Sequence, residues 1–370
     1  MNKRDSTSLK GVAILLMVFH HLFLNRDRFL SFNGSFFPIN ENLLVNISIS
    51  CKICVCFFSF ISGYGLYCSL KDCTFKKNFI TKWIKDHLLK MMSTYWLIST
   101  CSYILVFLLN YFFDFYYISL PSNNLIVNIF FILFDILGLS SIFNSFTLCG
   151  TWWYIGVAII FICVAPIIFM ALNRYSDYAV IFLVICIPFI LQLNYPRGEK
   201  FLTYLPIFVS GMIFAKRNIF DLIENLQFFK NKLCSKIVVL FSLILILLAL
   251  IFVMSKIDVI EENLWLIFYL VYPLILIILV KLYILKFKPI SIILFFLGKH
   301  SAHIWLIHTF IREYMMRYFH IFKHFLEIYI LLLFFSIITS YIIFAVKKLF
   351  NLFYKKIIHI HYLCQDEGEM

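Results

Sequence analysis

Basic side chains stand inside two apolar stretches of this sequence, where such groups are costly. The first stretch, LKGVAILLMVFHHLF, carries Lys10, His20 and His21. An ionisable group within a membrane helix is expensive, so its presence indicates a functional site. Imidazole gains and loses a proton near neutral pH, which suits histidine to acid–base chemistry.

The spacing of these residues predicts that two of them share one helix face. On a helix, Lys10 and His21 lie within about 20° of each other and about 16 Å apart along the axis. His20 points about 80° away from His21 by the same geometry. The alternative interpretation is structural: Lys10 anchors the helix at the membrane boundary, and a histidine bonds to a neighbouring helix.

The second stretch, LGKHSAHIWLIHTF, places three histidines in one apolar run. Ser301 and His308 share a helix face within about 20°. His300 and His303 are adjacent at i, i+3, but no HExxH glutamate accompanies them and no carboxylate occurs before Glu313. We therefore expect acid–base or binding roles here and no metal site.

Two further motifs contain hydroxyls and aromatic rings at membrane depth. In FFSFISGYGLY, Ser62 and Tyr64 flank a glycine, which favours close helix packing with hydroxyls bonding across it. In GTWWYIG, Trp153 belongs either to an interfacial aromatic belt or to the wall of a substrate site. The sequence leaves both interpretations open.

The composition excludes an ordinary soluble domain. The chain has 370 residues, of which 63% are hydrophobic, and its mean hydropathy is +0.94. These values predict an all-α, polytopic transmembrane helical bundle. The net charge of +13 comes from lysines and arginines clustered in short connections, so it predicts membrane orientation and no nucleic-acid partner.

Eleven apolar runs are candidates for membrane-embedded segments. They are 10–29, 43–70, 88–113, 125–143, 152–172, 178–194, 201–215, 236–254, 264–282, 290–312 and 327–346.

The distribution of charge tests whether all eleven runs cross the membrane. Basic residues near the N-terminus and in the 71–90 connection place both in the cytoplasm. If every later run crossed, the basic 216–232 connection and the basic 347–356 tail would lie outside. Removing the 125–143 run restores the expected orientation. We therefore predict about ten spans, one re-entrant or interfacial segment, and two cytoplasmic termini.

In this order the motifs resemble those of acyltransferase family 3, membrane O-acyltransferases of bacterial surface polysaccharides. Lys10 and His21 match a family pattern of Arg or Lys, ten residues, then His. The SGY stretch, the basic 76–90 connection and GTWWYIGVAI resemble later family motifs. LGKHSAHIWLIH resembles the late-helix motif, with Trp305 and His308 in matching positions.

The resemblance implies transfer of an acyl group, with acetyl as the expected one, from acyl-CoA to a hydroxyl of a surface polysaccharide or other envelope glycoconjugate. It implies no tightly bound cofactor, because acetyl-CoA is a donor substrate, and a place in the bacterial cytoplasmic membrane. Lys10, Lys82, Lys85 and Lys90 would bind the donor phosphates. Alternatively, the loop lysines only set the topology.

The resemblance also assigns roles to the motif residues. Lys10, His21 and His308 are the expected catalytic residues, with His21 as general base or as a transient carrier of the acyl group. His308 would orient the acceptor or stabilise the oxyanion. The residues expected to bind the acceptor are Ser62, Tyr64, Trp153, Ser301 and Trp305.

A transporter or flippase for a lipid-linked glycan is the competing class of protein, because intramembrane Lys and His would also line a translocation path. No repeat at half-length supports that class. We expect a single membrane-embedded domain over residues 1–370 without an appended soluble domain. Its partners would be acyl-CoA, the glycan acceptor and membrane lipid.

Overall fold

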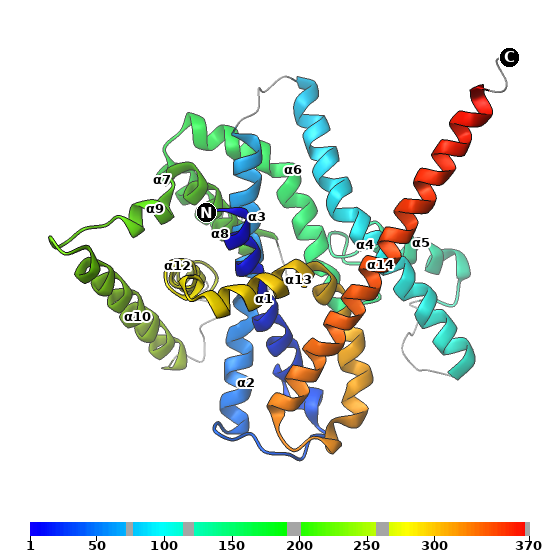
Figure 1. Cartoon of the computed structure of the whole chain (residues 1–370), viewed down its shortest axis with the longest axis horizontal. Coiled ribbons are helices and arrows are strands. Elements are labelled where there is room, and N and C mark those ends of the chain that lie inside the picture. The colour runs from blue at the N-terminus through cyan, green and yellow to red at the C-terminus, as the bar shows by residue number, and fades with distance from the viewer. Residues whose placement is uncertain (72–76, 114–121, 191–200, 257–265, 367–370) are drawn as a thin grey trace.

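In the described part of this computed structural model all regular secondary structure is helical and there are no strands, as the composition predicts. The structure describes residues 1–71, 77–113, 122–190, 201–256 and 266–366 (Figure 1). The helices are α1 (Lys3–Phe23), α2 (Glu41–Ser50), α3 (Cys54–Leu70), α4 (Lys77–Phe113), α5 (Leu125–Ile136), α6 (Trp153–Arg174), α7 (Asp177–Ile190), α8 (Phe201–Arg217), α9 (Ile219–Glu224), α10 (Lys232–Lys256), α12 (Tyr272–Leu282), α13 (Lys288–Met315) and α14 (Phe325–Asp366).

Short helical turns extend several of these helices. The 3-10 turns relevant to the site are η1 (Arg26–Phe29), η2 (Cys51–Ile53) and η3 (Gly150–Trp152), and η6 (Met316–Ile321) follows α13. Among the described residues, eight helical segments are long and apolar enough to cross a membrane. Two further apolar helices are shorter, Leu125–Ile136 and Asp177–Pro188. The chain is therefore a multi-pass membrane protein.

The segment that the charge pattern removes from the set of crossings forms the short helix α5. Its 12 residues extend about 18 Å, well below the roughly 30 Å of a bilayer core. Asp135 at its end is fully buried and accepts hydrogen bonds from the Tyr103 hydroxyl and the Leu148 backbone N–H, both at 2.8 Å. These bonds fix α5 and the loop after it against α4.

Helix α1 begins at Lys3, earlier than the apolar run that starts at residue 10. The cause is a capping box: the Asn2 side chain accepts from the Asp5 N–H at 2.8 Å, and the Asp5 carboxylate accepts from the Asn2 N–H. The helix ends at Phe23, before the polar segment that contains η1. His20 and His21 therefore lie in the last turn of α1.

Glycines allow the two closest helix crossings of the bundle. A side chain at Gly11 of α1 would overlap the Leu294 carbonyl of α13, and one at Gly298 of α13 would overlap the Thr7 carbonyl of α1. Helices α3 and α8 meet in the same way through Gly63 and Gly211. Small residues permit such backbone contact in membranes. The glycine of the SGY motif thus serves the close packing that its sequence favours.

The arrangement places α1 at the centre of the molecule. Helix α1 packs on α13, α3 and α2, and Figure 1 shows α13 crossing it. Helix α10 lies toward one edge, and the end of α14 projects away from the bundle. The last turn of α1 is consequently surrounded by protein, which is the setting that a buried polar site requires.

Candidate active site

A cavity of about 610 Å³ opens beside the last turn of α1. Its walls come from α1, the segment after it, η2 with α3, η3 with α6, and α13. The polar and aromatic residues that line it are His20, His21, Arg28, Lys52, Phe58, Thr151, Trp153, Tyr154, Trp305, Thr309, Arg312 and Glu313. Segments far apart in the chain thus form one polar chamber within an apolar bundle.

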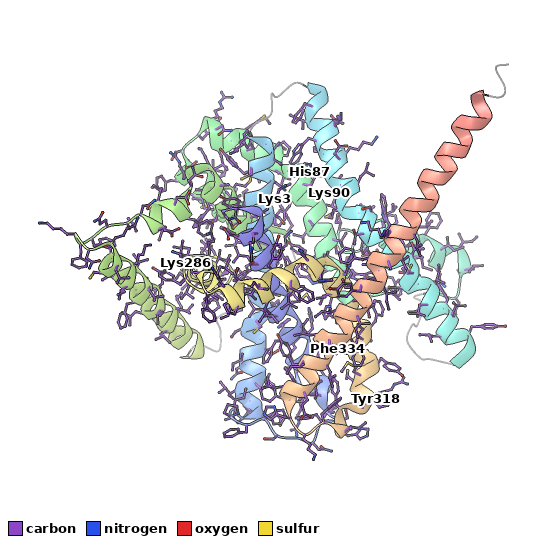
Figure 2. All side chains as sticks on the ribbon, in the orientation of Figure 1. Lys3, His87, Lys90, Lys286, Tyr318 and Phe334 are labelled. Carbon is purple, nitrogen blue, oxygen red and sulfur yellow. The ribbon has the colours of Figure 1, made fainter. Side chains whose placement is uncertain are left out.

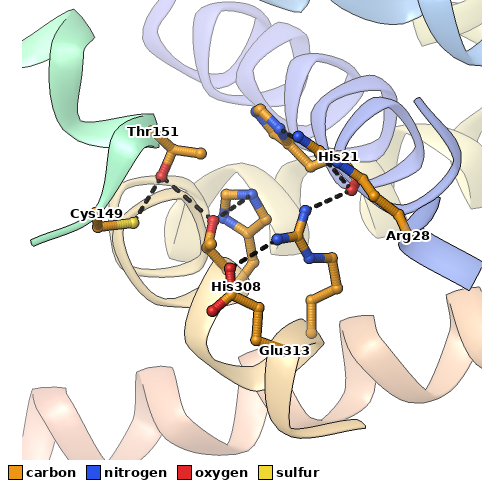
Figure 3. Close-up of polar contacts among 8 residues, drawn as sticks. His21, Arg28, Cys149, Thr151, His308 and Glu313 are labelled. Atoms are coloured by element: carbon orange, nitrogen blue, oxygen red, sulfur yellow. Dashed lines mark hydrogen bonds and ion pairs between the residues drawn. The ribbon is translucent and has the colours of Figure 1, made fainter. Parts of the chain in front are cut away.

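Two arginines hold His21 at the cavity wall. Arg28 and Arg312 both donate to the His21 carbonyl oxygen, at 2.7 and 2.8 Å (Figure 3). Arg28 Nη1 also approaches His21 Nδ1 at 3.4 Å. Burial lowers the pKa of Arg28, and the nearby Glu313 carboxylate opposes that effect. These contacts fix the end of α1 and the position of its imidazole.

His308 lies directly beside His21 and is fully buried. Their ring centroids are 5.0 Å apart, and Figure 3 shows His308 between Thr151 and His21. The His308 Nδ1 atom faces the carbonyl oxygens of Trp305 at 2.8 Å and Ile304 at 3.1 Å. Carbonyls only accept hydrogen bonds, so Nδ1 carries the proton in the neutral ring and Nε2 is left as an acceptor.

A chain of small polar groups connects His308 to the cavity. Thr309 Oγ1 lies 3.4 Å from His308 Nε2 and 3.3 Å from Thr151 Oγ1, and Cys149 Sγ lies 3.1 Å from the Thr151 hydroxyl. Thr151 and Thr309 line the cavity, whereas His308 does not. His308 can therefore influence the cavity through Thr309 as well as through His21.

Aromatic side chains form another part of the cavity wall. The Trp305 indole N–H donates to the Thr151 carbonyl at 3.1 Å, which joins α13 to η3. The Tyr154 hydroxyl is 3.0 Å from the Ser59 hydroxyl and also bonds to Ser62. Trp153 and Trp305, two of the residues expected to bind the acceptor, thus reach the cavity. Ser62 is not in the lining but supports Tyr154, which is.

The remaining histidines have different surroundings. His20 lines the cavity, and its Nδ1 contacts the Ser48 carbonyl at 2.8 Å. His300 and His303 both contact the Ser340 hydroxyl of α14, each through Nδ1 at 2.8 Å. Two of the three late histidines thus pair with α14, while His308 faces α1. In the described part of the chain no group of three potential ligands could hold a metal ion.

Other residues singled out in the sequence lie outside the cavity lining. Lys10 is partly buried and within electrostatic reach of Lys90, while Lys82 and Lys85 are exposed on α4. Figure 2 shows Lys3 and Lys90 in the upper part of the view and Tyr318 at its lower edge. None of the four lysines expected to bind a donor lines the cavity, and Lys10 and Lys90 lie near each other outside it.

Tyr64 and Ser301 also lie elsewhere. The Tyr64 hydroxyl accepts from the Met1 amino group at 2.7 Å, and Ser301 is buried in α13 outside the cavity lining. These positions give neither side chain contact with the cavity.

Reasoning from the sequence did not single out five polar residues of the cavity: Arg28, Lys52, Thr151, Thr309 and Arg312. Arg312 carried a usable signal, because it lies four residues after His308 in an apolar helix, where any charge indicates function. Arg28 and Lys52 gave no comparable signal, since charges are ordinary near the ends of membrane helices.

The fold and the cavity define a multi-pass membrane protein with paired imidazoles beside a polar chamber. In a comparison with protein families, the acyltransferase domain of acyltransferase family 3 matches residues 6–345. The chain therefore belongs to this family and is a membrane acyltransferase, as its motifs suggest. Searches among curated proteins and among solved structures found no match. Family membership gives no support to the transporter alternative.

Proposed function

We propose that this protein is an O-acyltransferase of the bacterial cytoplasmic membrane. It moves an acyl group, acetyl in the simplest case, from acyl-CoA to a hydroxyl of a surface polysaccharide or other envelope glycoconjugate. The observation that carries the proposal is the position of His21 at the cavity wall, with its ring centroid 5.0 Å from that of His308. A pair of imidazoles beside a polar chamber suits the proton transfers of acyl transfer.

In the proposed step, His21 accepts the proton of the acceptor hydroxyl. The hydroxyl oxygen attacks the thioester carbonyl, so that a C–O bond forms while the C–S bond breaks. The proton then passes from His21 to the departing thiolate. The arginines that hold the His21 carbonyl fix the end of α1 and so position the ring.

Transient attachment of the acyl group to His21 is the alternative route. Incubation with labelled acyl-CoA alone, followed by rapid quenching and peptide mass spectrometry, distinguishes the two. An acylated peptide containing His21 would favour the covalent route.

The donor is proposed to enter at the other end of α1. Lys10 and Lys90 are close enough to interact there, and ammonium groups are common partners of phosphate. With both termini in the cytoplasm, that end faces the compartment where acyl-CoA is made, and the cavity lies toward the outer side.

Mass spectrometry of surface polysaccharide tests the function directly. Cells with the wild-type protein should carry an ester-linked acyl mass on the glycan, and cells with His21→Ala or no protein should lack it. Glycan of identical mass in all three strains would contradict transfer to that polysaccharide, and labelled acyl-CoA with purified protein would then test other acceptors.

A further inference from the structure

Three cationic side chains line the cavity next to His21, but only one carboxylate does. The cations are Arg28, Lys52 and Arg312, and the carboxylate is Glu313. Glu313 forms an ion pair with Arg312, in which Arg312 Nη2 lies 2.8 Å from Glu313 Oε1. Most of the positive charge in this chamber is therefore without a matching anion on the described part of the chain.

The donor groups of these cations are only partly used. Each arginine gives one bond to the His21 carbonyl, although a guanidinium has five N–H donors. Arg312 is only 7% exposed, and its Nε has no hydrogen-bond partner among the described residues. Lys52 makes no side-chain hydrogen bond or ion pair within that same part of the chain. A buried donor without a partner is costly, so Arg312 Nε indicates a missing acceptor, and the half-buried Lys52 ammonium is available to the same acceptor.

We infer that the acceptor substrate is acidic, with a carboxylate or phosphate that binds to Arg28, Lys52 and Arg312. The inference rests on the proposed acyl transfer, because it assigns the chemical class of the molecule whose hydroxyl reaches His21. The paired N–H groups of an arginine guanidinium can bind two oxygens of a carboxylate or a phosphate at once. A bound anion would balance the surplus charge and satisfy the unused donors together.

The position of the anion follows from the contacts of the arginines. Because both guanidinium groups touch the His21 carbonyl, an anion on their free N–H groups lies within one sugar residue of the imidazole. The anion and the acylated hydroxyl therefore belong to the same saccharide unit or to adjacent ones. A sugar carboxylate, a sugar phosphate and the phosphate of a lipid carrier all meet this condition.

Binding measurements test the inference without requiring acyl transfer. Purified full-length protein is titrated calorimetrically with methyl glucuronide, methyl glucoside, glucose 6-phosphate and the phosphate-linked lipid dodecyl phosphoglucose. We expect at least one of the three anionic probes to bind at least about tenfold more tightly than neutral methyl glucoside, the gain of one charge-assisted hydrogen bond. The preferred anionic probe identifies the source of the negative charge.

Lys52→Gln is the informative variant, because Lys52 supports no other described side chain. This substitution should lower the affinity for the preferred anionic probe about tenfold and leave the affinity for methyl glucoside unchanged. Lys52→Arg should restore the affinity for the anionic probe. Lys323→Gln is the matched control, because it removes the same charge from an exposed loop near the cavity end of the molecule. The backbone of this loop bonds to Ser35. The control should change neither affinity.

Three results would overturn the inference: equal binding of neutral and anionic probes, no effect of Lys52→Gln, or an effect of Lys52→Gln on acyl-CoA affinity alone. The last result would assign the cations to the donor. If anionic probes bind as expected but no labelled acyl group moves to any acceptor, the anion site stands and the proposed transferase function fails.

Discussion

His21 is the side chain whose removal best separates chemistry from folding. Its ring faces the cavity, while its backbone carbonyl makes the contacts to Arg28 and Arg312. Substitution of the ring therefore leaves those two bonds intact. We expect His21→Ala to lower kcat for acyl transfer by roughly 10²–10⁴-fold, the usual contribution of a positioned acid–base group.

Membrane-protein yield and melting temperature provide the control for that variant. Both should remain close to wild type if His21 acts in catalysis. Loss of the protein from the membrane would instead favour a structural role for this histidine.

Thr309 tests whether His308 acts through the hydroxyl chain. Thr309→Val keeps the shape of the side chain but removes the hydroxyl that lies 3.4 Å from His308 Nε2. We expect kcat to fall about five- to tenfold, in line with the loss of one hydrogen bond. Thr309→Ser should restore most of the rate. Equal rates for the Val and Ser variants would show that the hydroxyl has no part in the reaction.

At the scale of the elements, the crossing of α1 and α13 brings His21 to His308. The two backbones meet where Gly11 and Gly298 leave space. Gly298→Ala adds a methyl group against the Thr7 carbonyl, and we expect a destabilisation of about 1–3 kcal/mol from overpacking. Thermal unfolding in detergent, followed together with acyl transfer, measures both consequences.

Gly65 supplies a matched control for the same substitution. It lies in α3, and no neighbouring heavy atom would come within 4 Å of an added side chain. Gly65→Ala should be neutral or stabilise by up to about 1 kcal/mol, because alanine favours helix more than glycine does. Equal losses in Gly65→Ala and Gly298→Ala would mean that the close crossing is not what limits stability.

At the scale of the whole molecule, the proposed orientation in the membrane would place the donor and the acceptor on opposite sides. Lys82 belongs to the basic connection expected in the cytoplasm, and Lys323 lies in the loop between η6 and α14, at the cavity end. In a background freed of reactive native cysteines, we expect Lys323→Cys to react with an impermeant maleimide on intact cells. Lys82→Cys should react only after permeabilisation. Labelling of both positions in intact cells would contradict the two-sided arrangement.

The sequence by itself determined the class of the protein. Apolar runs, short basic connections and intramembrane histidines are local properties, because hydropathy and helical period depend only on nearby residues. Those properties predicted the helical membrane fold, a re-entrant or interfacial segment at 125–143, and His21 and His308 as residues of interest. The ordered motifs then indicated the acyltransferase family, which the family comparison confirms.

Only the tertiary structure decided which residues meet. Arg28, Lys52 and Arg312 come from three separate segments, and His300 and His303 face α14 although they lie in the same motif as His308. Lys10 shares a helix with His21 but lies near Lys90 instead of the cavity. The reason is that contacts between distant residues depend on how the helices cross. Close backbone packing at glycines such as Gly11 and Gly298 fixes those crossings. No local sequence pattern specifies which two helices meet at a given glycine.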